Sequence, residues 1–210
     1  MKIDLFYAPK ACSLVPYLLL EEAAATYEVH VLNLRGGEQN SAQYLALNPK
    51  HKVPLLVVDG KPLSENLAIQ MWIAHSFPEA QLLPQDPWKA SEALSLLSWC
   101  ASGFHPPLSR VNSPDRYCGA ESPAATVAEI AMAQLREQFS IAEDLLDGRS
   151  YLLGDFSVAD AYFFWCYRRA DQLGVDLGDM PRCRAHFETV AARPSAISVL
   201  DFEAQVLRGG

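Results

Sequence analysis

The first third of the chain alternates short apolar runs with longer amphipathic stretches. The apolar runs at 3–7 and 55–58 and the alternating apolar and polar residues at 27–34 predict strands, and Asp59-Gly60 predicts a hairpin turn into a short strand at 61–63. Apolar residues at helical spacing predict helices over 12–24, 41–47 and 64–77. The resulting order, βαβ–αββα, predicts a small mixed sheet with helices packed against it.

The rest of the chain has no segment with the periodicity of a strand. Residues 78–87 contain three prolines and predict a linker. Pro106-Pro107 and Pro114 are expected to interrupt the first helical region that follows. The predicted fold is therefore an α/β domain over 1–77, the linker 78–87 and an all-helical bundle over 88–210. The helices of this bundle are predicted over 88–104, 124–146, 157–173, 182–192 and 196–207.

Composition and charge narrow the classes of partner. Half of the 210 residues are apolar and 20% are charged, which predicts a sizeable core and excludes global disorder. The net charge of −8 disfavours nucleic acid and anionic membranes as partners. No apolar run reaches the about 18–20 residues that a membrane-spanning helix needs. The five cysteines form no C-x-x-C pair and have no zinc-site spacing, so we expect free thiols, a cytoplasmic protein and no metal.

Cys12 follows a predicted strand and a proline-containing loop, and it begins the predicted helix 12–24. A helix N-terminus carries unpaired N–H groups and a positive partial charge, which favour thiolate and lower a thiol pKa. Lys10 adds a positive charge nearby. Val15 stands where C-x-x-C proteins have their second cysteine, so Cys12 is predicted to act as a single thiol. The alternative is a small buried core thiol.

Two segments are candidates for binding a ligand through the backbone and through charges. Val53-Pro54 precedes the third predicted strand, and a cis bond there would leave the flanking backbone N–H and C=O free for an extended ligand. His51 and Lys52 can pair with a carboxylate or remain solvated loop charges.

Ser64 is the predicted N-cap of the helix over 64–77, with Glu65 and Asn66 in its first turn. In a functional interpretation, Glu65 accepts an ammonium while nearby N–H groups hold a carboxylate. In a structural interpretation, the same residues only cap the helix and compensate its dipole. Spacing alone leaves both open.

Taken together, these segments resemble the cytosolic glutathione transferases, and the bacterial beta class most closely. The resemblance covers nearly the whole chain, and the set is specific in this order and spacing. It implies a thioredoxin-like domain that binds glutathione, followed by a helical domain that completes the active site. The matching segments are Leu5-Phe6-Tyr7 with Ala11-Cys12-Ser13, Asn48-Pro49 with Val53-Pro54, Ser64-Glu65, Leu82-Leu83-Pro84 and Phe156-Ser157-Val158-Ala159-Asp160-Ala161.

The resemblance implies a role for each part of the glutathione site. Cys12 would lie beside the glutathione sulfur, the Val53 backbone would pair with the cysteinyl part, and Glu65 would hold the γ-glutamyl end. Asn66 stands where the beta class usually has glycine and other classes have serine. Arg35-Gly36-Gly37 stands where the beta class has basic residues, so His51 and Lys52 become the candidates for the glycyl carboxylate. The implied glutathione ligands are His51, Lys52, Val53, Pro54, Glu65 and Asn66.

The group that activates the glutathione sulfur stays open among Cys12, Ser13, Tyr7 and His105. Other classes use a tyrosine or a serine for this step, and both are present here. His105 lies where the beta class has a histidine of the helical domain, although a histidine near a helix end can also serve only the helix dipole.

The implied function is conjugation of the glutathione thiol to a hydrophobic electrophile, as a cytoplasmic, homodimeric detoxification enzyme with glutathione as co-substrate. One alternative is a glutathione-dependent thiol or peroxide redox enzyme that acts through a Cys12 mixed disulfide. The other is a non-catalytic binding module. The residues suggested for the hydrophobic pocket are Phe104, Pro106 and Trp165.

The segment around Ser157 has a local structural interpretation. Ser157 at the N-cap and Asp160 three residues later predict a reciprocal capping box, worth about 1 kcal/mol. Asp160 is therefore predicted to be structural and not catalytic.

Overall fold

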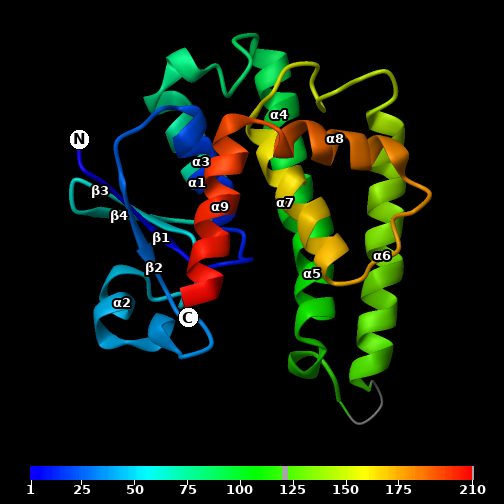
Figure 1. Ribbon diagram of the computed structural model, residues 1–210, viewed down its shortest axis with the longest axis horizontal. Helices are drawn as coiled ribbons and strands as arrows, with labels where there is room; N and C mark the ends of the chain where they lie inside the picture. Colours follow the sequence, from blue (N-terminus) through cyan, green and yellow to red (C-terminus); the bar gives the residue numbers. More distant parts are fainter. Residues whose placement is uncertain (120–122, 210) are drawn as a thin grey trace. The chain divides into compact units, whose positions relative to one another are not determined.

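The computed structural model describes residues 1–119 and 123–209, which form two compact units (Figure 1). The first unit contains residues 1–83 and 192–209. The second contains residues 84–119 and 123–191.

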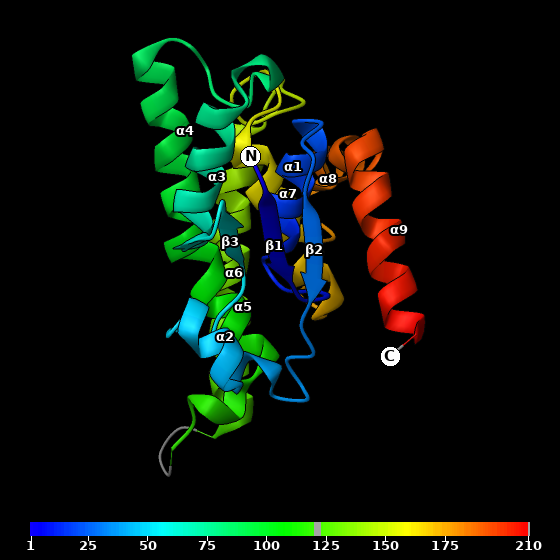
Figure 2. The same cartoon turned by 90° about the vertical axis from the view of Figure 1, so that its left-hand side faces the viewer.

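A four-stranded mixed sheet lies at the centre of the first unit. Its strands β1 (Ile3–Tyr7), β2 (Glu28–Val31), β3 (Leu55–Val58) and β4 (Lys61–Ser64) take the order β2-β1-β3-β4. Figure 2 shows β1 and β2 side by side and parallel, whereas β3 is antiparallel to both β1 and β4. The predicted βαβ unit and hairpin are confirmed, and β2 is shorter than the predicted 27–34.

Four α-helices belong to the described part of the first unit: α1 (Leu14–Glu22), α2 (Ala42–Leu47), α3 (Asn66–Ser76) and α9 (Pro194–Gly209). Residues 14–20 of α1 are all buried, and β1, α3 and α9 all contact this helix. Helix α9 belongs to the first unit by its contacts with α1, although its sequence position falls in the expected helical half, 88–210.

The start of α3 differs from the prediction. Ser64 pairs with Leu55 as the last residue of β4, so it does not cap the helix. The N-cap is Glu65, which has φ 77° and ψ 121° and makes no side-chain capping hydrogen bond. The left-handed backbone at Glu65 turns the chain directly from strand to helix, which leaves no place for a serine cap.

The second unit consists of helices in the described residues. They are α4 (Pro87–Trp99), a π-helical turn (Cys100–Phe104), α5 (His105–Asn112), a 3-10 turn (Pro114–Arg116), α6 (Ala124–Leu145), α7 (Val158–Gln172) and α8 (Pro181–Ala191). The predicted interruption near Pro106-Pro107 is confirmed, since α4 ends at Trp99 and a π-helical turn separates it from α5. The two prolines follow His105 in the first turn of α5, where a missing N–H costs little. Pro114 begins a separate 3-10 turn after α5 has ended.

The predicted capping box at the start of α7 is confirmed. The Ser157 hydroxyl accepts from the Ala159 N–H, and the Asp160 carboxylate accepts from the Ser157 N–H at 2.9 Å. None of the helices in the described part of the chain combines the length and apolar character needed to span a membrane.

Candidate active site

Cys12 lies in the turn between β1 and α1. Its thiol donates to the Val53 carbonyl at 3.6 Å, and the Asn66 side-chain amide donates to the Cys12 carbonyl at 2.9 Å. Three segments that are distant in the sequence therefore meet here: the strand-to-helix turn, the loop before β3 and the first residue of α3. This convergence agrees with the grouping of Cys12, Val53 and Asn66 that the sequence suggests.

The expectation of a lowered pKa at Cys12 is wrong. The residue is 7% exposed, and burial raises the pKa of its thiol from 9.0 to about 12. The Asn66 amide, the backbone N–H of the turn and the Lys52 charge lower this pKa, but their combined effect is smaller than that of burial. The desolvation of a buried thiolate thus outweighs the favourable position before α1. At neutral pH the Cys12 thiol is protonated and acts as a hydrogen-bond donor.

Ser13 and Tyr7, the other candidate activators from the first unit, are both fully buried. The Ser13 hydroxyl accepts from the Ala8 N–H at 3.0 Å and donates to the Ala8 carbonyl at 3.2 Å. The Tyr7 hydroxyl donates to Glu203 Oε2 at 2.8 Å. These hydrogen bonds give both hydroxyls structural partners around the loop 8–13 that carries Cys12.

Glu203 on α9 is a buried residue near the cysteine turn that was not predicted from the sequence. It is 1% exposed, and the same Oε2 atom that accepts from Tyr7 also accepts from the Lys10 N–H at 2.7 Å. The residue lies four positions after the buried Val199, on the apolar face of its helix. The sequence did contain a signal for Glu203, namely a charged residue on the apolar face of a predicted amphipathic helix.

Replacing Glu203 by alanine is expected to lower the free energy of unfolding by about 2–4 kcal/mol, since two donors in a buried site lose their acceptor. Urea denaturation followed by circular dichroism measures the loss. Tyr7→Phe is the matched control, because it removes one donor and keeps the acceptor, and it should cost about 1 kcal/mol. Equal losses for the two variants would contradict a shared role of the carboxylate.

The loop before β3 is held by buried side chains. The Val53–Pro54 peptide bond is cis, as the fold context suggested. The Lys52 carbonyl accepts from the Tyr44 hydroxyl at 2.6 Å and from the Asn48 side-chain amide at 2.8 Å. These two contacts fix the backbone that leads into Val53.

His51 and Lys52, the candidates for a second carboxylate, are exposed. His51 has φ 57°, and its Nδ1 lies 2.9 Å from Asn40 Oδ1. Lys52 is close enough to Cys12 for its charge to lower the thiol pKa. Lys52 is thus the cation of this pair that acts electrostatically on the cysteine.

Glu65 and Asn66 have different surroundings at the start of α3. The Glu65 carboxylate is exposed, and its Oε1 lies 2.6 Å from Lys50 Nζ. Asn66 is buried, and besides its bond to Cys12 it accepts from the Gln70 amide at 3.1 Å. Glu65 is therefore an exposed carboxylate paired with Lys50, whereas Asn66 connects the helix to the cysteine turn.

The remaining predicted residues lie in the second unit. His105 Nδ1 is 2.9 Å from the Tyr162 hydroxyl, and its ring centroid is 4.8 Å from that of Trp165. Phe104 has no exposed surface and contacts other aromatic rings, so it contributes to the helical core. Those rings belong to Trp99, Phe139 and Phe163.

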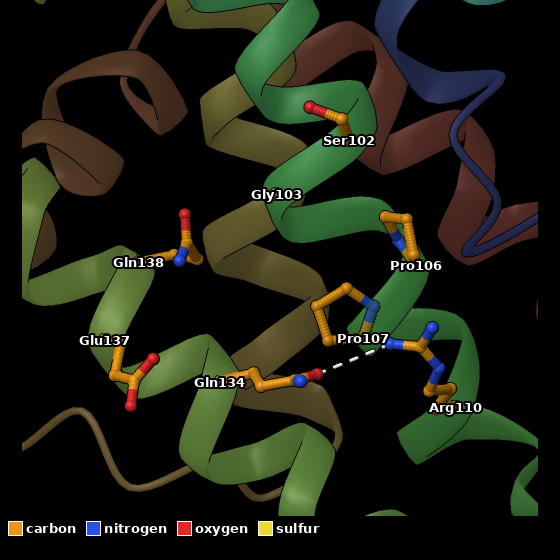
Figure 3. A pocket seen from close by; sticks show the side chains of 8 residues that line it. All are labelled: Ser102, Gly103, Pro106, Pro107, Arg110, Gln134, Glu137 and Gln138. Carbon is orange, nitrogen blue, oxygen red and sulfur yellow. Dashed lines mark hydrogen bonds between the residues drawn. The ribbon is translucent and has the colours of Figure 1, made fainter.

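Pro106 lines a cavity of about 420 Å³ in the second unit. Figure 3 shows side chains of α6 opposite those of α5, with Arg110 Nη1 3.4 Å from Gln134 Oε1. The lining carries charges of both signs, so it differs from the apolar pocket expected around Phe104, Pro106 and Trp165. The lining residues are Ser102, Gly103, Pro106, Pro107, Arg110, Gln134, Glu137 and Gln138.

One group among the described residues has the composition of a metal site. Asp4, Glu28 and His30 each place one ligand atom within 4.8 Å of the others. The Lys2 ammonium lies 3.4 Å from the Asp4 carboxylate and 3.8 Å from that of Glu28, so a cation already compensates both charges. The His30 hydrogen bond lowers the pKa of Asp4.

Comparison with known proteins covers most of the chain. Residues 1–75 match the family model "Glutathione S-transferase, N-terminal domain", and residues 110–194 match "Glutathione S-transferase, C-terminal domain". The Escherichia coli O157:H7 protein named glutathione S-transferase GstA is 30% identical over 208 aligned residues, and the match covers 96% of this chain and 98% of that protein. Further relatives are named maleylacetoacetate isomerases.

Solved structures of glutathione transferases resemble nearly the whole chain. A glutathione transferase homologue from Sulfitobacter, with bound glutathione, is 30% identical and has a TM-score of 0.88 over 95% of this chain and 97% of that one. The bacterial beta class glutathione S-transferase of Sphingomonas chungbukensis is 30% identical and has a TM-score of 0.84 over 95% of this chain and 98% of that one.

Proposed function

Because the chain belongs to the glutathione S-transferase family, we propose that it binds glutathione at Cys12, Val53 and Glu65 and joins the glutathione thiol to a hydrophobic electrophile. The observation that carries the proposal is the meeting of the cysteine turn, the cis-proline loop and the start of α3. Together they offer a sulfur partner, a backbone segment and an exposed carboxylate.

Each part of glutathione has a counterpart in this arrangement. The γ-glutamyl ammonium pairs with the Glu65 carboxylate, which is exposed and makes no capping hydrogen bond to its own helix. The Val53 backbone accompanies the cysteinyl part. Lys52 supplies positive charge for the glycyl carboxylate, and the His51 ring can donate a hydrogen bond to it.

The raised pKa of Cys12 favours a donor role over a nucleophilic one. A thiol that stays protonated can donate a hydrogen bond to the glutathione sulfur, which stabilises the ligand's thiolate and lowers the ligand's pKa. The redox alternative needs the Cys12 thiolate itself as the attacking group, and burial disfavours that form. Conjugation is therefore the preferred reaction, and a panel of aryl halides, epoxides, peroxides and disulfides distinguishes it from the redox alternative.

We also propose a cytoplasmic homodimer. The five cysteines are free, which suits a reducing compartment. Three large apolar side chains of α6 are exposed, namely Ile130, Ile141 and Leu145, and a two-fold interface is the commonest way to cover such a surface. Light scattering of the full chain measures the association state.

The glutathione site is tested by Glu65→Ala. We expect the affinity for glutathione to fall about tenfold to a hundredfold, because the ligand ammonium would lose its charged partner. Calorimetric titration measures the change, and Glu79→Ala is the control, since it removes an equal, exposed charge elsewhere in the first unit. If the unmodified protein fails to bind glutathione at millimolar concentration, the proposed function is refuted. The same result would favour a binding module with another ligand.

A further inference from the structure

The Glu65 carboxylate already has a cation as its partner. Lys50 Nζ lies 2.6 Å from Glu65 Oε1 and 3.1 Å from the Ser64 hydroxyl. We propose that Lys50 is a built-in competitor of the substrate ammonium: it occupies on Glu65 the position that the γ-glutamyl ammonium takes, and it must leave before that end of the ligand is held. This inference rests on the proposed function.

The backbone places Lys50 for this contact. Its N–H donates to Asn48 Oδ1 at 3.1 Å, and the side-chain amide of the same asparagine donates to the Lys52 carbonyl. Asn48 is 2% exposed, so the two bonds form a fixed support for the loop. The lysine is thereby anchored to the same buried residue that orders the cis-proline loop.

Glu65 is likewise placed for an ammonium and not for its own helix. Its left-handed backbone makes it the N-cap of α3, yet its side chain makes no capping hydrogen bond. The carboxylate instead reaches the lysine, which lies 15 residues earlier in the chain. The purely structural interpretation of Glu65 as a capping residue is therefore not what the contacts support.

The Lys50–Glu65 pair is weak enough to be displaced. The side chains are 52% and 66% exposed, and water screens an ion pair of this kind, which contributes at most about 1 kcal/mol. A competitor of that strength lowers ligand affinity by about twofold to fivefold. Lys50 would thus lower the affinity for glutathione and select ligands whose ammonium pairs with Glu65 more strongly than the Lys50 ammonium does.

A role of Lys50 in binding the ligand predicts the opposite change in glutathione affinity. If Lys50 instead held a carboxylate of the ligand, removing its charge would weaken binding. The effect of Lys50→Met on glutathione affinity therefore distinguishes a competitor from a ligand.

The test is calorimetric titration at low ionic strength with the full chain. We expect Lys50→Met to bind glutathione about twofold to fivefold more tightly than the unmodified protein. The gain should be absent for a glutathione analogue whose γ-glutamyl amino group is replaced by hydrogen, and absent when Glu65→Ala is also present. Lys61→Met, an exposed lysine of β4, controls for the change in net charge.

The outcomes separate the two proposals. Unchanged or weaker glutathione binding by Lys50→Met overturns the competitor role while leaving the glutathione site intact. Failure of every variant to bind glutathione refutes the proposed function itself. A thermal melt equal to that of the unmodified protein confirms that Lys50→Met is folded, as expected for an exposed side chain.

Discussion

Replacing Asp160 by alanine is expected to lower the free energy of unfolding by about 3–5 kcal/mol, because it removes a buried charge that accepts four hydrogen bonds. The residue has no exposed surface. Its Oδ1 accepts from the Leu152 N–H at 2.8 Å and lies 2.9 Å from His186 Nε2. Its Oδ2 accepts from the N–H and the hydroxyl of Ser157, at 2.9 and 2.8 Å.

The expected loss exceeds that of an ordinary cap for a specific reason. A capping box alone is worth about 1 kcal/mol, whereas Asp160 also connects the loop at Leu152 and the helix that carries His186. Alanine would leave donors from all three segments without an acceptor in a site that water does not reach. The aspartate therefore stabilises the tertiary structure of the second unit in addition to one helix end.

Urea denaturation of the full chain, followed by circular dichroism and tryptophan fluorescence, measures this loss. Asp160→Asn keeps one acceptor oxygen and should show an intermediate effect. Asp171→Ala is the matched control, since it removes an exposed aspartate from the same helix and should change stability by less than about 0.5 kcal/mol. A loss below about 1 kcal/mol for Asp160→Ala would mean that capping is its whole contribution.

The elements of the fold were predictable because their signals are local. β1 and β3 have the predicted bounds, since short apolar runs bounded by turn residues leave little choice. Ser157 and Asp160 lie three residues apart, and the capping box between them needs no distant partner. The predicted start of α3 was wrong because the left-handed backbone at Glu65 depends on how β4 pairs with β3. The sequence around Glu65 does not specify that pairing.

The sequence motifs predict members for the candidate site, but they do not predict the contacts among them. Cys12, Val53 and Glu65 follow from the motifs, whereas the Tyr7–Glu203 bond joins residues 196 positions apart. The pKa of Cys12 depends on a balance between its position before α1 and its burial, and only the structure gives the second quantity. The sequence patterns thus gave neither the burial of individual side chains nor the hydrogen bonds between residues distant in the chain.

Cys12 is expected to react with iodoacetamide at neutral pH at least about a hundredfold more slowly than an unhindered thiol. Raising the pKa from 9.0 to about 12 reduces the thiolate fraction about a thousandfold, and burial also limits access. The exposed Cys118 thiol provides an internal reference in the same protein. Peptide-resolved mass spectrometry over time measures both rates at once, and Cys118→Ser confirms the assignment of the fast site.

The pH dependence of this reaction follows from the same shift. Between pH 7 and 9 the Cys12 rate should rise about tenfold per pH unit without levelling off, because the thiol titrates only near pH 12. The fold favours the protonated thiol, so its contribution to stability is fully present below pH 9 and is lost as the pH rises towards 12. Cys12→Ala should therefore show a weaker loss of stability in that range. Labelling of Cys12 as fast as Cys118 at pH 7 would mean that the thiolate is stabilised after all, and it would restore the mixed disulfide with glutathione as the preferred chemistry of this site.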